Sequence, residues 1–336
     1  MSQFNLQAGV SRKRQWITYA IGIMLLMLSL LSSISVGAYQ IDFASVIASF
    51  FTDETTQGTL IIHDVRLPRA VIGMIIGMNL AIAGAIMQSI TKNPLASPQI
   101  FGVNAGASLM IVIVAILLPN FSQSWLIYFA FLGAAVGGFI VYSMASYGGM
   151  TPVKLALAGI TVHLFLTSII EGMIIFHEHS TEDVLFWLAG SLSGRDWDHV
   201  QMILPWTLIG IIGAMFLSKS FTLLSLGDDV AKGLGQKIAF IRIASAIIVI
   251  ILAGSSVAVA GPIGFIGLMI PHIARKLVGV DYRHVIPCSA LLGAVLLVGA
   301  DVLSRFISFP SESPVGIVTA LIGGPFFLYL ARREGR

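Results

Sequence analysis

Ten apolar runs, most of them long enough to cross a membrane, constrain this sequence more than any other feature. A helix needs roughly 20 residues to cross about 30 Å of hydrocarbon. Three runs are shorter or broken by Gly and Pro, but neighbouring helices can satisfy the backbone groups that an isolated helix would expose. We therefore predict an all-α polytopic membrane protein with about ten transmembrane helices. The seven clear runs are 16–38, 67–90, 126–147, 153–176, 200–218, 241–261 and 285–307, and the three shorter runs are 103–118, 263–278 and 314–331.

The composition agrees with a chain that lies mostly in lipid. Of the 336 residues 57% are hydrophobic and only 10% are charged. The first run is followed by "SSISVGAYQ", a poor cleavage site, so we expect a retained span rather than a signal peptide. Cys288 is the single cysteine, which excludes an intrachain disulfide. The basic residues are scattered between spans, as topology signals are, and do not form a face for nucleic acid.

The charges of the loops predict the orientation. Ten spans place both basic termini on one side, and the positive-inside rule makes that side the cytoplasm. We expect a cytoplasmic tail at 1–15, one permease domain at 16–331 with ten spans, and a second tail at 332–336. Threading the chain between them puts 15 of the 19 Lys and Arg inside and most of the acidic residues outside. The four exceptions are Arg66, Arg69, Arg195 and Arg305. The location of these four arginines outside goes against the positive-inside rule and needs an explanation other than topology.

A weak internal repeat relates two parts of the chain that are 177 positions apart. In the predicted topology the first copy runs inward and the second outward, which is the arrangement of the inverted repeats that build transport paths. Matches among small residues also arise by chance from membrane composition. The residues of the first copy are Gly77, Ala81, Ala83, Gly84, Pro94, Gly102 and Val103, and those of the second are Gly254, Ala258, Ala260, Gly261, Pro271, Gly279 and Val280.

The cytoplasmic stretch "LSLGDDVAKGLG", residues 224–235, predicts a short ordered surface helix. Asp228 or Gly227 can cap its start and Gly235 can end it. The sequence has no GxxxxGK[ST] phosphate loop, so any ATP must be bound by another chain.

Six stretches in the order found here resemble a permease subunit of the iron-siderophore and cobalamin ABC importers, the vitamin-B12-permease-like or FecCD family. The resemblance covers nearly the whole chain from about residue 60. The stretches are "RLPR" (66–69), "AGAIMQSITKNPLASPQIFGVNAGA" (83–107), "LSLGDDVAKGLG" (224–235), "VAGPIGFIGLMIPHIARKLVG" (259–279), "GADVLSR" (299–305) and "SPVGIVTALIGGPFFLYL" (313–330).

The resemblance implies partners on both sides of the membrane. In the family two ten-helix subunits enclose a central path, two ATPase subunits dock inside and a two-lobed substrate-binding protein docks outside. Arginines matching Arg66, Arg69 and Arg305 pair there with carboxylates of the binding protein, for which the guanidinium fork is well suited. Snorkelling to the interface is the competing interpretation, above all for Arg69. Asp301, four residues before Arg305, can also satisfy part of its charge.

The resemblance also assigns the 225–235 helix to coupling with the ATPase. Its candidate residues are Ser225, Gly227, Asp228, Asp229, Lys232 and Gly235. The alternative is a plain amphipathic connector.

Three polar residues, His163, Thr167 and Glu171, share one face of the fifth span, the helix that lines the path in relatives. Polar groups within spans are costly and usually paired or functional. The alternative is that His163 bonds a neighbouring helix and that Glu171 reaches water. We expect no metal at "HEHS" (177–180), since a zinc site needs more ligands at fixed spacing.

The resemblance implies a bacterial cell-membrane permease, not an enzyme, that moves a bulky ferric siderophore. It binds no cofactor itself and uses ATP held by partner subunits. Cobalamin or haem cargo stays open, as does an identical or paralogous second permease. An ion-coupled secondary transporter would need buried acids on several helices, and only Glu171 and Asp301 come near that. No nucleophile–base or metal-ligand arrangement suggests a membrane enzyme.

Overall fold

A computed structural model describes residues 11–37, 56–118, 123–147, 151–177, 181–307 and 311–334, together with single positions in the loops between them. Helices and turns account for this part of the chain, and it contains no strand. In the described residues ten helices match the ten apolar runs, and seven of them are long and apolar enough to cross a membrane. The predicted all-α fold class is confirmed. The bounds of these ten helices are α1 Arg12–Ser35, α4 Leu67–Thr91, α5 Val103–Leu117, α6 Gln123–Ser146, α7 Pro152–Phe176, α9 Trp197–Phe216, α12 Ile238–Ala260, α13 Ile266–Val278, α14 Tyr282–Ile307 and α15 Val315–Glu334.

Six short helices join or extend the long ones. They are α3 Gln57–Leu60, the π-helical turn η1 Ile61–Arg66, the 3-10 turn η2 Pro98–Phe101, α8 Thr181–Leu188, α10 Ser218–Ser225 and α11 Asp228–Gly233.

The helix that carries α4 starts earlier than the sequence predicts. A capping box at Thr56 opens α3, and α3, η1 and α4 then form one continuous helix from Gln57 to Thr91. The π-helical turn lies just before Pro68, which has no N–H to donate, and wider turns of this kind accommodate such a break. Arg66 therefore lies within a helix and not in an outer loop, which corrects that expectation.

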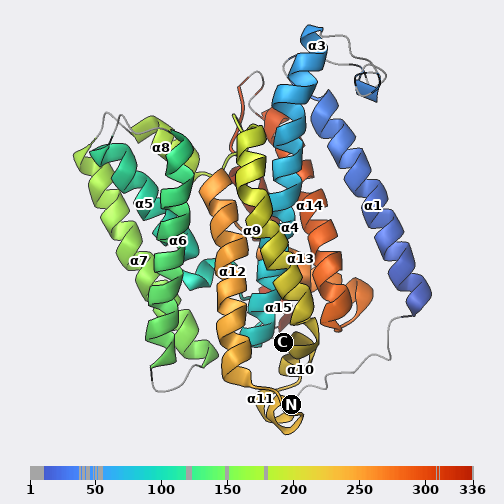
Figure 1. Cartoon of the computed structure of the whole chain (residues 1–336), viewed down its shortest axis with the longest axis vertical. Coiled ribbons are helices and arrows are strands. Elements are labelled where there is room, and N and C mark those ends of the chain that lie inside the picture. The colour runs from blue at the N-terminus through green and yellow to red at the C-terminus, as the bar shows by residue number, and fades with distance from the viewer. Residues whose placement is uncertain are drawn as a thin grey trace.

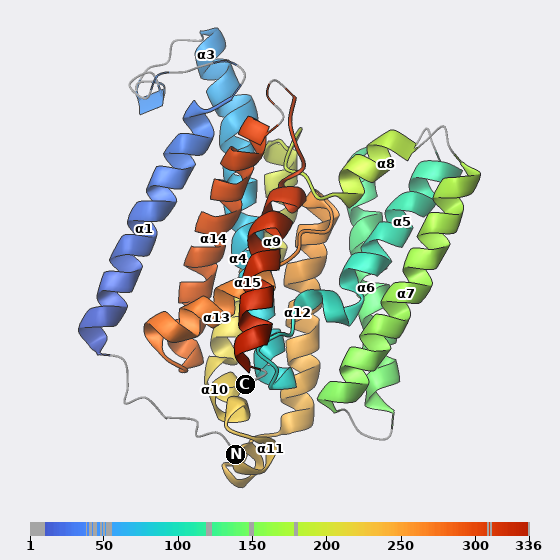
Figure 2. The ribbon, with the colours of Figure 1, turned by 180° about the vertical axis from the view of Figure 1, so that it is seen from behind.

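Helix α4 is the centre of the molecule. It packs against α14, α12, α13 and α9, and most of its side chains are buried. At the other extreme α1 lies along α14 with most of its surface uncovered (Figure 1). Helices α5, α6 and α7 form a group at the far side of the molecule, joined to the rest mainly through α6 and α12. Helix α15 crosses the back, against α13 and α14 (Figure 2).

Glycines allow the closest helix contacts. A Cβ on Gly106 would lie 2.1 Å from the carbonyl oxygen of Gly133, and one on Gly137 would lie 2.5 Å from that of Gly102. Helices α5 and α6 thus meet backbone to backbone, as small residues four apart predict. The pair Gly73 and Gly77 behaves differently, because only Gly77 faces a backbone, at α14.

The two ends of the molecule differ in what they hold. Helix α1 begins, α15 ends, and α10 and α11 lie at one end, which we call the basic end (Figures 1 and 2). Helix α4 runs toward the basic end and α12 away from it, which confirms the opposite directions predicted for the two repeat copies. Gly102 and Gly279 both have a positive φ, of 68° and 89°. Pro94 lies in a turn whereas Pro271 lies inside α13, so the copies differ locally.

Candidate docking and coupling sites

The guanidinium of Arg66 closes the end of α1, away from the basic end. Its Nη1 donates to the carbonyl oxygens of Ile34 and Ser35, both at 2.7 Å, and its Nη2 donates to that of Tyr39. The last carbonyls of a helix have no partner within the helix. Arg66, at the end of η1, supplies a hydrogen-bond donor to these carbonyl oxygens.

Arg69 joins α4 to the segment before α15. Its Nη2 lies 2.8 Å from Oδ1 of Asp301 on α14, and its Nη1 lies 2.7 Å from the carboxylate of Glu312. Burial alone would raise the pKa of Glu312. The charge and hydrogen bond of Arg69, a hydrogen bond with Ser193 and the charge of Arg305 together hold that pKa below its usual value. Two carboxylates thus hold one buried fork in a defined geometry.

Arg305 shares the carboxylate of Asp301 and also reaches α1. Its Nη2 donates to Oδ2 of Asp301, as the spacing of four residues predicted. Its Nη1 donates to the carbonyl oxygens of Ser33 and Val36, both at 2.8 Å. Asp301 therefore lies between two arginines, at the point where α1, α4 and α14 meet.

We call Arg66, Arg69, Arg305, Asp301 and Glu312 the arginine network. The three arginines are 5%, 6% and 6% exposed, and the carboxylates that two of them contact belong to this same chain. Contact with a docking partner would require these donors to leave their present acceptors. Their docking role stays a prediction, and in this structure they tie α1, α4, α14 and the segment before α15 together.

Arg195, like Arg66, forms no ion pair with a carboxylate of the described residues. It follows Gly194, which turns the chain at a φ of 68°, and precedes α9. Its Nε is buried without a hydrogen-bond partner in the part of the chain that the structure describes, and burial lowers the pKa of its guanidinium. Asp196 beside it caps α9 instead, bonding the backbone of Asp198 and His199. The structure thus shows Arg195 as a largely buried guanidinium without an ion pair in the described part of the chain.

The predicted short helix at the basic end is present as α11. Gly227 is its N-cap with a φ of 126°, and Gly235 closes it with a φ of 81°. The N–H of Gly235 donates to the carbonyl oxygen of Lys232, and that of Gln236 to the carbonyl oxygen of Ala231. This pair of bonds is a glycine C-cap, so the predicted role of Gly235 is confirmed.

Asp228 bonds inward and does not cap α11. Its carboxylate lies 2.8 Å from Nζ of Lys92, just after α4, and 2.8 Å from Nη2 of Arg242 on α12. Partial burial alone would raise the pKa of Asp228, but these two cations outweigh it and lower the pKa. One side chain therefore joins α11 to the α4 and α12 helices of the two repeat copies.

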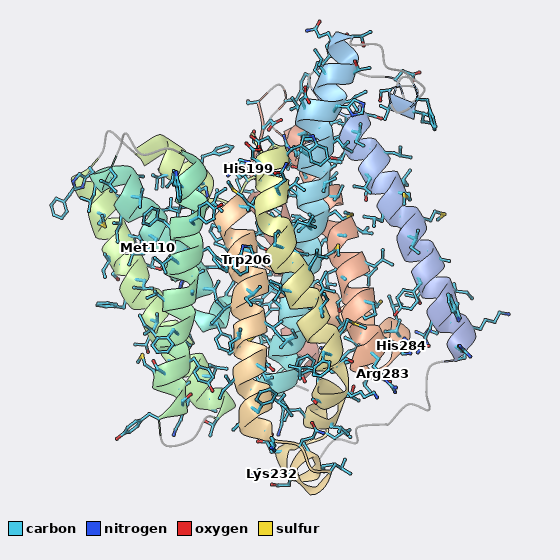
Figure 3. The ribbon with its side chains drawn as sticks, in the orientation of Figure 1. Met110, His199, Trp206, Lys232, Arg283 and His284 are labelled. Carbon is cyan, nitrogen blue, oxygen red and sulfur yellow. The ribbon has the colours of Figure 1, made fainter. Side chains whose placement is uncertain are left out.

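The outward surface of this element is partly apolar. Leu226, Val230 and Leu234 follow each other at intervals of four and are 51%, 48% and 58% exposed. Ser225, Asp229 and Lys232 are exposed beside them, and Lys232 lies at the tip of the molecule (Figure 3). An apolar stripe flanked by charges suits a protein partner better than water.

The three polar residues of α7 turn away from the rest of the chain. Val162 and Leu166 are among the residues that α7 buries within the molecule, whereas His163 and Glu171 are exposed and Thr167 is half-buried. They are free to face a second subunit or a path between subunits, which stays a prediction. In the "HEHS" stretch only His177 is described, and residues 178–180 lie outside the described part. Within the described residues no group of three His, Cys, Asp or Glu could hold a metal.

The model of the FecCD transport family matches residues 25–333 of this chain. The chain belongs to the FecCD transport family. It is similar to the Fe(3+)-citrate import system permease protein YfmD of Bacillus subtilis, with 55% identity over 94% of both chains. It is also similar to the ferric enterobactin permease protein FepD of Escherichia coli, with 38% identity over 94% of both chains. Among solved structures it resembles an inward-facing metal-chelate type ABC transporter, with a TM-score of 0.83, 28% identity and coverage of 95% of this chain and 99% of the other.

As a FecCD permease, the chain is a transport subunit of an ABC importer and not an enzyme.

Sequence reasoning on this FecCD permease missed three contributors to the sites. Glu312 was counted only as an outer acid, Lys92 only as an inner cation, and Arg195 only as an exception to the charge rule. No local signal pairs Arg69 with Asp301, which are 232 residues apart.

Proposed function

We propose that this FecCD permease moves a bulky ferric chelate, of the ferric-siderophore class, from a substrate-binding protein across the bacterial cell membrane. The names of its relatives support this cargo, since they are permeases for Fe(3+)-citrate, iron(3+)-hydroxamate and ferric enterobactin. Cobalamin or haem is the alternative cargo.

The second permease of the complex is a paralogue and not an identical chain. In Bacillus subtilis the Fe(3+)-citrate system has two permease proteins, YfmD and YfmE, which are 55% and 39% identical to this chain. The hydroxamate system likewise has FhuB and FhuG, at 48% and 34%. Two unequal relatives in each system support a heterodimer here, with the exposed polar face of α7 available to the path.

Both termini lie in the cytoplasm, where two ATPase subunits bind ATP and dock on α11. The positive-inside count supports this orientation, and the exposed stripe of Leu226, Val230 and Leu234 supports the docking. The binding protein docks at the opposite end. There the arginine network holds the helix ends in place, and Arg195 has no ion pair within the described residues.

Reconstitution into proteoliposomes tests the function. The full set contains this chain, its paralogue, the two ATPase subunits and the binding protein, with 55Fe-labelled ferric citrate, ferric hydroxamate, ferric enterobactin, haem and labelled cyanocobalamin offered separately. We expect ATP-dependent uptake of one ferric chelate, lost when the ATPase, the binding protein or the paralogue is omitted. Uptake of cyanocobalamin or haem alone would refute the ferric cargo. Full uptake without the paralogue would refute the heterodimer.

A further inference from the structure

A half-open cavity of about 550 Å³ lies between the first turns of α1 and α14, at the basic end and away from both sites described above. Its lining residues are Arg12, Gln15, Trp16, Tyr19 and His284. Figure 3 places His284 and Arg283 at the lower end of α14, on the side of α1. The cavity therefore lies at the level where the transmembrane helices leave the membrane.

Three hydrogen bonds hold the walls of this cavity together. Nη2 of Arg14 donates to the carbonyl oxygen of Lys276 at 3.0 Å, and Nε2 of Gln15 donates to that of Val278 at 3.1 Å. The hydroxyl of Tyr19 donates to the carbonyl oxygen of His284 at 3.1 Å. The start of α1 is thus tied to the end of α13 and the start of α14, and the cavity lies between anchored elements.

The surroundings of the cavity carry a strong positive charge. In residues 11–19 and 276–284 the one carboxylate is that of Asp281, and Arg283 already holds it at 2.7 Å. Arg12 lines the cavity and makes no hydrogen bond or ion pair with the residues that the structure describes. The cations of these two segments are Arg12, Lys13, Arg14, Lys276 and Arg283. An anion entering the cavity would meet several cations, and the one carboxylate of these two segments is already paired with Arg283.

An apolar surface continues from the cavity along α1. Trp16 at the cavity is 66% exposed, and Ile23 and Met27, at helical spacing on the same face, are 51% and 56% exposed. Farther along α1, the side chain of Leu291 on α14 packs against Gly22. A Cβ on Gly22 would lie 2.5 Å from Cδ2 of Leu291. A ligand matched to this site carries a negative head and a long apolar tail.

We propose that the cavity binds the headgroup of an anionic phospholipid, with its acyl chains along Trp16, Ile23 and Met27. Each Lys or Arg near an anionic headgroup contributes about 1 kcal/mol, or about fivefold in affinity. Tryptophan prefers the membrane interface, where its ring lies at headgroup level. The bound lipid holds α1, the least covered long helix, against α13 and α14.

Photocrosslinking of the full chain in nanodiscs tests the proposal. The probes are phosphatidylglycerol and phosphatidylcholine with the same photoreactive group near the headgroup, and labelled peptides are mapped by mass spectrometry. We expect phosphatidylglycerol to label peptides containing residues 12–19 or 282–291 at least about fivefold more than phosphatidylcholine does. Equal labelling by the two lipids would overturn the proposal.

Two variants and one control locate the charge effect. Arg12→Gln and His284→Gln each change the cavity lining, and the Arg12 variant should lose about fivefold in labelling. Lys219→Gln removes an exposed cation of α10 outside the cavity lining and should change nothing. Each variant must elute from gel filtration as the unmodified chain does. Labelling that neither cavity variant weakens, or that 10-fold excess inorganic phosphate abolishes, would exclude a lipid headgroup site.

Discussion

At the scale of single residues, Asp301 is the residue that joins the buried arginines at the end of the molecule opposite α11. It is buried on α14, and its two oxygens are shared by Arg69 and Arg305. Removing one member of a buried ion pair leaves the other charge uncompensated, which costs more than the pair itself contributes.

We expect Asp301→Asn to lower the free energy of unfolding by about 3–5 kcal/mol, because the buried Arg305 then has no carboxylate partner and Arg69 keeps only Glu312. Thermal unfolding of the purified chain in detergent measures this. Arg195→Gln is the matched control and should stay within about 0.5 kcal/mol, since Arg195 makes no ion pair in the described part of the chain. A stability for Asp301→Asn within that range of the unmodified chain would contradict the network.

At this end the sequence predicted one of the observed ion pairs and missed the others. The pair of Asp301 with Arg305 follows from the spacing on one helix and is confirmed. The pairs of Arg69 join elements far apart along the chain, so no spacing could reveal them.

At the scale of elements, α11 is bonded to the helices that it is proposed to move. Because the pKa of Asp228 is lowered, its carboxylate stays charged at neutral pH. The contribution of the pair is present above the usual carboxyl pKa and is lost only as the pH falls through the lowered value. A push on α11 would therefore reach Lys92 after α4 and Arg242 on α12 at the pH of the cell.

We expect Asp228→Asn to lower the amount of chelate transported per ATP by about two- to fivefold, because partly exposed ion pairs contribute up to about 1 kcal/mol each. The ATPase subunits should still copurify. Parallel measurement of uptake and phosphate release in the reconstituted complex gives the ratio.

Asp198→Asn, on α9 at the opposite end, is the matched control, since Asp198 is exposed and has no ion pair within the described residues. It should leave the ratio unchanged. Equal ratios for the two variants would show that the bonds of Asp228 do not carry the coupling.

At the scale of the whole molecule, the proposed orientation decides which partner meets which end. Cys288 is the single cysteine and is buried, so an introduced cysteine is the one that a bulky reagent can reach. The tip of α11 and the loop of Arg195 lie at opposite ends of the molecule, on opposite sides of the proposed membrane (Figure 3).

We expect a membrane-impermeant maleimide to label Arg195→Cys in intact spheroplasts and Lys232→Cys only after lysis. Mass spectrometry of the purified chain measures the labelled fraction, with the unmodified chain as the control for Cys288. Labelling of Lys232→Cys in intact spheroplasts would reverse the orientation and both docking assignments.

The sequence by itself determined the ten helices, their order and the family. These features depend on runs of apolar residues, on charge counts between them and on motifs within short stretches, all of which are local. The tertiary structure decided where the charged side chains point. Arg66 and Arg69 turn inward, and Asp228 bonds Lys92 and Arg242 in place of capping α11. The Nε of Arg195 is buried without a partner in the described part of the chain. In a low-dielectric interior each buried charge must pair with an opposite charge or a carbonyl group. Only the packing of helices that are distant in the sequence determines which group becomes its partner.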